Sequence, residues 1–254
     1  MSVEPRPAAG PASPAAGSGA GARGSNGPAA SPAGSGGGAG AGVRARLLHA
    51  RLVRGRVAAE RVRTLLGGLR ALGVLLAAMW IVELVNLLDG YRLDAEGIVP
   101  RSVSHLDGIA FAPFLHVSVS HILGNTVPFA ILGAGVALAG ARRLLTVTAI
   151  AALVSGLGVW LIAPSHSDTV GASGVIFGYA TYLIARGFFD RRLGELALGA
   201  VVALLFGGVL VADLLPHPGI SWQAHLFGGV GGVIAAAALS RRATAGVARA
   251  PASR

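Results

Sequence analysis

The chain has 254 residues, of which 53% are hydrophobic and only 13% are charged. A soluble domain carries about 25% charged residues, so this composition excludes an ordinary soluble globular protein. All 21 basic residues are arginine, the formal net charge is +10, and the absence of cysteine excludes disulfides, cysteine-ligated metals and thiol catalysis.

The first 43 residues predict a disordered tail. Ala, Gly, Ser and Pro make up 36 of these 43 residues, so the segment has too little apolar surface to offset the entropy lost on ordering. It also lacks the apolar stretch of a secretory signal peptide. Residues 243–254 predict a second, shorter disordered tail.

Residues 44–69 predict a basic amphipathic segment, because arginines alternate with leucines and valines at roughly helical spacing. Such a segment either binds an anionic membrane surface or is a solvated helix that only sets the orientation of the chain. The sequence leaves both interpretations open, and both place the segment in the cytoplasm.

Residues 70–242 predict an all-α membrane domain. A spanning helix needs about 20 mostly apolar residues, and six runs separated by short polar connections meet this condition. They lie at about 70–88, 111–140, 144–163, 171–188, 194–215 and 221–240. The second run is long and contains Pro128, which predicts a kink or a re-entrant start.

The arginines predict how these helices are oriented. They cluster before the first run, between the second and third, between the fourth and fifth, and after the sixth, whereas the other side carries two arginines and several acidic residues. The positive-inside rule therefore places both termini in the cytoplasm. Because topology accounts for the excess of arginine, we expect no nucleic-acid partner.

Four polar side chains in these runs are predicted to lie at one depth. Ser173 and His225 are near the outer ends of the fourth and sixth spans, while His121 and Asn125, spaced i and i+4, share one face of the second. Polar groups inside spans are costly and often mark function. Their convergence from three helices predicts a site in the outer half of the membrane.

The residue types at this site allow nucleophilic catalysis. His225 can take the proton of the Ser173 hydroxyl, and the side chains of His121 and Asn125, with the Ser173 backbone N–H, can stabilise an oxyanion. No carboxylate is required. Asp168 and Asp213 lie near the outer face and are weaker candidates for orienting His225.

Glycines around these residues favour close approach of the helices. Gly171 and Gly174 flank the serine, and Gly228 and Gly232 form a G-x-x-x-G step just after His225. This step is typical of tightly packed membrane helices, and it predicts contact between the fourth and sixth spans.

Taken together, the motifs resemble those of the rhomboid family of intramembrane serine proteases over about residues 95–240. They are H-x-x-x-N at 121–125, G-x-S-G at 171–174, A-H-x-x-G-x-x-x-G at 224–232, and the stretch FAPFLHVSVSHILGN. The resemblance implies a six-helix bundle with Ser173 as nucleophile, His225 as general base, and His121 and Asn125 in the oxyanion hole. It also implies an aromatic ring, here Phe177, beside the catalytic histidine. The loop at 89–110 lacks the Trp-Arg pair of some bacterial members.

We therefore expect a serine endopeptidase that cleaves single-span membrane proteins near the outer face of a bacterial plasma membrane. Its expected partners are substrate transmembrane segments and the lipid bilayer, with no metal or cofactor. The substrate, the oligomeric state and the role of the tail do not follow from the sequence. One alternative is a non-catalytic rhomboid-like protein that binds membrane clients, which the intact Ser173 and His225 disfavour. The other is a small transporter, which would show internal repeats, and the sequence shows none.

The remaining polar positions favour structural roles. His116 lies about 140° around a helix from His121, which favours structural hydrogen bonding over catalysis. Glu83, in the first span, is predicted to face the bundle or pair with a polar neighbour. Three further histidines are predicted to be solvated loop residues, namely His105, His166 and His217.

Overall fold

The computed structural model describes residues 37–240, with side-chain surroundings for His49 and from Arg51 onward. The predicted C-terminal tail, and the predicted N-terminal tail as far as residue 36, lie outside this range. The chain divides into two compact units, Met1–Ala50 and Arg51–Arg254. Of the first unit, the structure describes residues 37–50, which form the start of α1; this helix begins at Gly37, within the segment predicted as tail.

The described residues are helical, with isolated β-bridges as their only extended pairing. The α-helices are α1 (Gly37–Leu88), α2 (Gly108–Phe111), α3 (Val119–Ala137), α4 (Ala141–Ile162), α5 (Ser173–Asp190), α6 (Leu193–Ala212) and α7 (Trp222–Ala238). Three short 3-10 helices, η1 (Arg92–Glu96), η2 (Val103–His105) and η3 (Ala112–Phe114), lie between α1 and α3. The predicted basic segment 44–69 is part of α1, which continues without a break into the first span.

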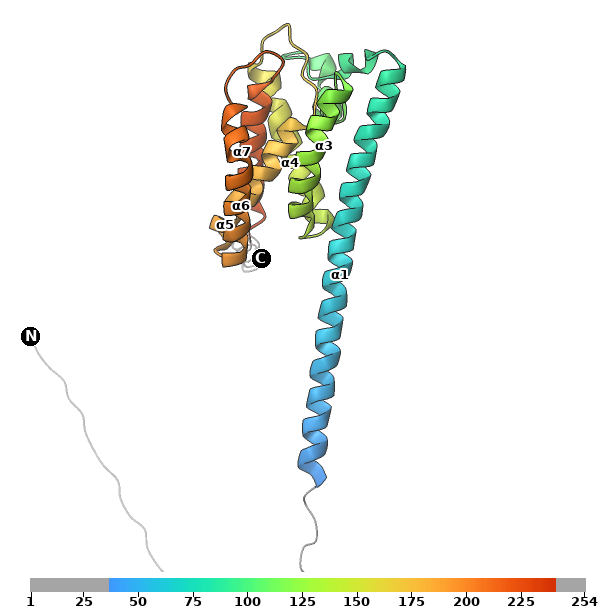
Figure 1. Cartoon of the computed structure of the whole chain (residues 1–254), viewed down its shortest axis with the longest axis vertical. Coiled ribbons are helices and arrows are strands. Elements are labelled where there is room, and N and C mark those ends of the chain that lie inside the picture. The colour runs from blue at the N-terminus through green and yellow to red at the C-terminus, as the bar shows by residue number, and fades with distance from the viewer. Residues whose placement is uncertain (1–36, 241–254) are drawn as a thin grey trace, which may run out of the picture. The chain divides into compact units, whose positions relative to one another are not determined.

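Four of these helices are long and apolar enough to cross a membrane on their own: Arg51–Leu88 within α1, and all of α3, α4 and α6. The predicted all-α membrane bundle is therefore confirmed. The shorter helices α5 and α7 do not meet that measure. They pack against each other, and α5 also contacts α3, α4 and α6 (Figure 1).

Glycines bring α5 and α7 into backbone contact. A Cβ atom at Gly228 would overlap the carbonyl of Gly174, and one at Gly232 would overlap the carbonyl of Gly178. Thr181 of α5 donates a hydrogen bond to the carbonyl of Gly229, 2.8 Å away. The two helices predicted to carry the nucleophile and the base therefore lie as close as their backbones allow.

The second predicted span, 111–140, starts later than expected. Its first part consists of the end of α2, then η3 and an extended residue, Leu115, and α3 begins only at Val119. Ser118 caps α3, because its side chain accepts a hydrogen bond from the backbone N–H of His121, 3.2 Å away. The predicted re-entrant start is thus a pair of short helical turns, and Pro128 lies inside α3.

Backbone hydrogen bonds fix the loop that precedes α5. Ile98 and Thr169 exchange two of them, with N···O distances of 3.0 and 3.2 Å, and the N–H of Gly171 donates to the carbonyl of Ala112 at 2.8 Å. The start of α5 is therefore attached to the segment before α3.

Candidate active site

Ser173 is the first residue of α5, so its backbone N–H has no partner in the preceding turn of helix. Gly171, two residues earlier, has a φ of +119°, a conformation that side chains rarely adopt. The hydroxyl of Ser173 is partly exposed and makes no hydrogen bond within residues 37–240. A hydroxyl and free N–H groups therefore lie together at a helix N-terminus.

His225 lies in the first turn of α7, which Ser221 caps by accepting from the N–H of Ala224 at 3.3 Å. Its ring is buried and stacks on Phe177, with centroids 4.2 Å apart and planes 7° from parallel. Nδ1 lies 2.9 Å from the backbone carbonyl of Asp213. Because a carbonyl only accepts hydrogen bonds, Nδ1 carries the proton and Nε2 keeps a lone pair.

Helices α4, α5 and α7 meet beside these two residues. Ser155 of α4 donates a hydrogen bond to the carbonyl of Ala224, 2.8 Å away. A Cβ at Gly174 would overlap Ser155 Oγ and lie 3.1 Å from the same carbonyl. The residue after Ser173 therefore contacts the residue before His225, which places the serine and the histidine on adjoining helix turns.

His121 and Asn125 lie on the other side of Gly171. A Cβ at Gly171 would be 2.9 Å from both Cε1 and Nε2 of His121, and 3.5 Å from Nδ2 of Asn125. Nδ2 of Asn125 is buried and has no hydrogen-bond partner within the described residues. Two side chains with N–H donors therefore face the glycine that leads into the serine.

A cavity of about 440 Å³ adjoins this group of residues. His121 contributes to its wall, together with residues of the 163–170 and 216–223 loops. Asp168 and His217, on these loops, are exposed, and so is the nearby His166. Water can therefore reach His121 from the loop end of the bundle, while Ser173, Asn125 and His225 do not line this cavity.

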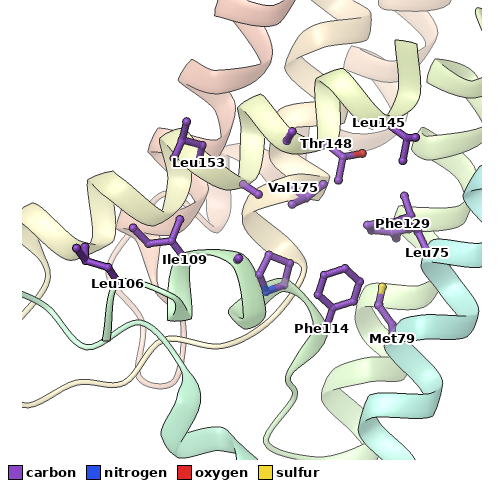
Figure 2. A pocket seen from close by; sticks show the side chains of 14 residues that line it. Leu75, Met79, Leu106, Ile109, Phe114, Phe129, Leu145, Thr148, Leu153 and Val175 are labelled. Carbon is purple, nitrogen blue, oxygen red and sulfur yellow. The ribbon is translucent and has the colours of Figure 1, made fainter. Parts of the chain in front are cut away.

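A second cavity, of about 480 Å³, is apolar and contains none of the predicted site residues. Figure 2 shows Leu75 and Met79 of α1, Phe114, and Leu145 and Thr148 of α4 around it. Val175 of α5 also borders it. This cavity offers no chemistry of its own, and the polar residues of the candidate site lie outside its wall.

Two further histidines were predicted to have structural or solvated roles. His105 is half-buried, and its Nδ1 lies 2.8 Å from Ser102 Oγ and 3.0 Å from Ser104 Oγ, so it is not simply solvated. His116 is completely buried, and neither ring nitrogen makes a hydrogen bond of standard geometry within the described residues, so its predicted structural hydrogen bonding stays a prediction. Burial, and next the neighbouring His121, lower the pKa of His116 to about 4, and the nearby backbone of Phe114 opposes this shift.

Three hydrogen-bonding groups that position the site residues were not predicted from the sequence. Asp213 was a candidate for orienting His225 through its carboxylate, but the contact is made by its backbone carbonyl, and neither this carbonyl nor that of Ala112 carries a side-chain signal. Ser155 has one weak signal, since it is a polar residue inside the apolar run 144–163. Within the part of the chain that the structure describes, no three His, Asp or Glu side chains gather so as to hold a metal ion.

Comparison with known proteins reports a match to the rhomboid domain over residues 103–242. An uncharacterized protein of Mycobacterium tuberculosis is 41% identical over 189 residues, covering 71% of this chain and 78% of that protein. One from Mycobacterium leprae is 39% identical, with 71% and 74% covered. A Bacillus subtilis protein named "Putative rhomboid protease YdcA" is 30% identical over 122 residues, covering 47% of this chain and 60% of its own length.

Proposed function

Since the chain belongs to the rhomboid family, we propose that it is an intramembrane serine protease that uses a Ser173–His225 dyad. The observation that carries this proposal is the state of His225. Its Nδ1 is engaged by the Asp213 carbonyl at 2.9 Å, which leaves Nε2 available as a base, and its ring lies against Phe177, one helical turn after Ser173. Stacking on Phe177 holds the ring in this orientation.

In the first step, Nε2 of His225 takes the proton of the Ser173 hydroxyl while Oγ attacks the carbonyl carbon of the substrate peptide bond. Negative charge develops on the carbonyl oxygen. The backbone N–H of Ser173, Nε2–H of His121 and Nδ2 of Asn125 are the donors that stabilise it. The C–N bond then breaks, and the leaving amine receives the proton from His225.

In the second step, water hydrolyses the acyl-enzyme. His225 takes a proton from the water molecule while the water oxygen attacks the ester carbonyl. The proton then passes from His225 to Ser173 Oγ as the ester bond breaks. The product is a free carboxyl terminus. The cavity bounded by the 163–170 and 216–223 loops supports this step, because it brings water as far as His121, whose ring lies against Gly171, two residues before Ser173.

The expected substrate is a single-span membrane protein. A peptide carbonyl inside a helix is hydrogen-bonded and shielded, so the segment must unwind before attack, and residues of low helix propensity near the cut favour unwinding. With both termini in the cytoplasm of a bacterium, the site opens toward the outer face of the plasma membrane.

The test is proteolysis in liposomes. The wild-type chain and Ser173→Ala are each reconstituted with a panel of tagged single-span segments, including segments with glycine or proline near the outer end. We expect the wild type to cleave at least one segment and Ser173→Ala to cleave none. Mass spectrometry of the fragments then locates the cut. Cleavage that persists in Ser173→Ala would exclude this serine as the nucleophile.

A fluorophosphonate probe separates a protease from a non-catalytic client-binding protein of the same fold. The probe phosphonylates an activated serine, with fluoride as the leaving group, without needing a particular substrate. We expect labelling of the wild type and none of Ser173→Ala or His225→Ala. A wild-type chain that is folded, cleaves no segment and takes up no probe would favour the binding protein.

A further inference from the structure

Behind the candidate oxyanion hole lies a buried polar cluster centred on Asn86, near the end of α1. Asn86 is completely buried. Its Nδ2 donates to Asp94 Oδ1 at 2.8 Å and to the carbonyl of His116 at 3.3 Å, and its Oδ1 accepts from the N–H of Leu93 at 3.1 Å. One side chain therefore joins α1, η1 and the segment that leads into α3.

This cluster reaches His121 through His116. The two rings meet edge to face, with centroids 5.0 Å apart and planes at 72°. The Nε2 side of His121 faces Gly171, whereas its Nδ1 is buried on the opposite side without a hydrogen-bond partner among the described residues. Within residues 37–240, the ring of His121 is therefore held by packing against its neighbours and not by a hydrogen bond at Nδ1.

Asp94 supplies a charge at this position. Its carboxylate is linked to the backbone of His116 through Asn86, and the ring of His116 meets that of His121. Burial raises the pKa of Asp94, while the hydrogen bond from Asn86 and the proximity of His121 act in the opposite direction. A second carboxyl, Glu83, lies three residues before Asn86, is 2% exposed, and has no hydrogen-bond partner within the described residues.

We propose that Asp94 and Asn86 are positioning residues that hold His121 from behind, with its Nε2–H directed toward the substrate oxyanion. This inference rests on the proposed function. Neither residue contacts substrate. Asn86 fixes the carboxylate of Asp94 and the backbone of His116, and these two groups orient the ring of His121. Donors to an oxyanion act only when aimed at the place where the charge develops, so support behind the ring affects the rate.

The test is a double-mutant cycle on the full chain in liposomes, read as the rate at which Ser173 reacts with a fluorophosphonate. Asp94→Asn keeps the shape of the side chain and an acceptor for Asn86 but removes the charge. Its partner in the cycle is His121→Ala. Asp89→Asn is the matched control, because Asp89 lies five residues away and is exposed, with only a long contact to Arg92 at 3.8 Å.

If Asp94 acts through His121, the two substitutions are not additive. We expect Asp94→Asn to slow labelling about tenfold in the wild type and less than twofold in His121→Ala, since the group it positions is then absent. Asp89→Asn should leave the rate unchanged in both backgrounds. An equal loss in both backgrounds, or no loss in the wild type, would overturn the proposal. If Asp94→Asn does not fold, Asn86→Ala takes its place under the same criterion.

A second readout is independent of the protease proposal. ¹⁵N-histidine NMR of the solubilised chain reports on the ring nitrogens of His121, whose signals are identified by their loss in His121→Ala. We expect Asp94→Asn to shift them and Asp89→Asn to leave them in place. If the wild type takes up no fluorophosphonate, the proposed function fails while this measurement still decides the link. Unshifted signals in Asp94→Asn would overturn it.

Discussion

At the scale of single residues, Gly171 is a position where the candidate site has little room for a side chain. Its φ of +119° disfavours any side chain, and a Cβ would press on the ring of His121. We expect Gly171→Ala to reduce cleavage and fluorophosphonate labelling by about 100-fold or more, the loss typical of a disturbed oxyanion hole. Gly124→Ala is the control, since Gly124 lies beside Asn125 and faces open space. Equal activity of the two variants would contradict the assigned geometry.

Substitution of Asp213 tests whether the site is a Ser-His dyad or a Ser-His-Asp triad. His225 is oriented by the backbone carbonyl of Asp213, which survives substitution of the side chain. We therefore expect Asp213→Asn to cleave within about twofold of the wild type, whereas loss of an orienting carboxylate in a Ser-His-Asp triad costs about 10⁴-fold. Asp168→Asn should behave in the same way. A collapse of the rate in Asp213→Asn, with the fold intact, would mean that its carboxylate takes part.

The lowered pKa of His116 predicts how the stability of the folded chain depends on pH. Its pKa is about 4 in the folded chain against an ordinary 6.5, so unfolding takes up a proton between these values. His116 therefore does not lower the free energy of unfolding above about pH 6.5. As the pH drops toward 4, His116 lowers it by at most about 3 kcal/mol. We expect His116→Phe to lose less stability than the wild type between pH 7 and pH 4 when unfolding is followed in detergent. His166→Phe, at an exposed position, should follow the wild-type curve; parallel curves for all three proteins would contradict the assignment.

At the scale of elements, the contact between α5 and α7 carries the site. A methyl group at Gly228 has no room, because it would overlap the carbonyl of Gly174. We expect Gly228→Ala to lower the free energy of unfolding by about 1–3 kcal/mol, the usual cost of overpacking, and to reduce activity at the same time. Gly208→Ala on α6, where a Cβ would meet open space, is the control. Equal unfolding midpoints in a denaturant titration would argue against a tight contact.

The positions of the helices could be predicted from the sequence where hydropathy determines them. They could not be predicted well where a single hydrogen bond determines where a helix begins. The apolar runs located α4 and α6 to within a few residues, because lipid requires about 20 apolar residues per span. The start of α3 was misplaced by eight residues, since the cap from Ser118 is a local contact that hydropathy does not register. Of the residues around the site, Ser173, His225, His121 and Asn125 stood out as polar groups in apolar runs, whereas the carbonyl that orients His225 left no trace in the sequence.

At the scale of the whole molecule, the arrangement explains why a polar site is stable inside a membrane protein. α5 lies among α3, α4, α6 and α7, so its small residues contact protein on several sides. The apolar helices α3, α4 and α6 supply lipid-facing surface, with side chains such as Leu123, Leu161 and Leu204 exposed. The polar groups are thereby kept from lipid, where each unpaired one would cost several kcal/mol.

The orientation of this bundle decides which compartment meets the cut substrate. The arginine distribution predicts that the α4–α5 loop is outside and the α5–α6 loop is in the cytoplasm. Because the chain contains no cysteine, single-cysteine variants report accessibility without background. We expect a membrane-impermeant maleimide to label His166→Cys on intact cells and Arg192→Cys only after lysis; both side chains are exposed. The reverse pattern would turn the cavity beside His121 toward the cytoplasm, and the substrates would then have to be sought among segments cut at their inner ends.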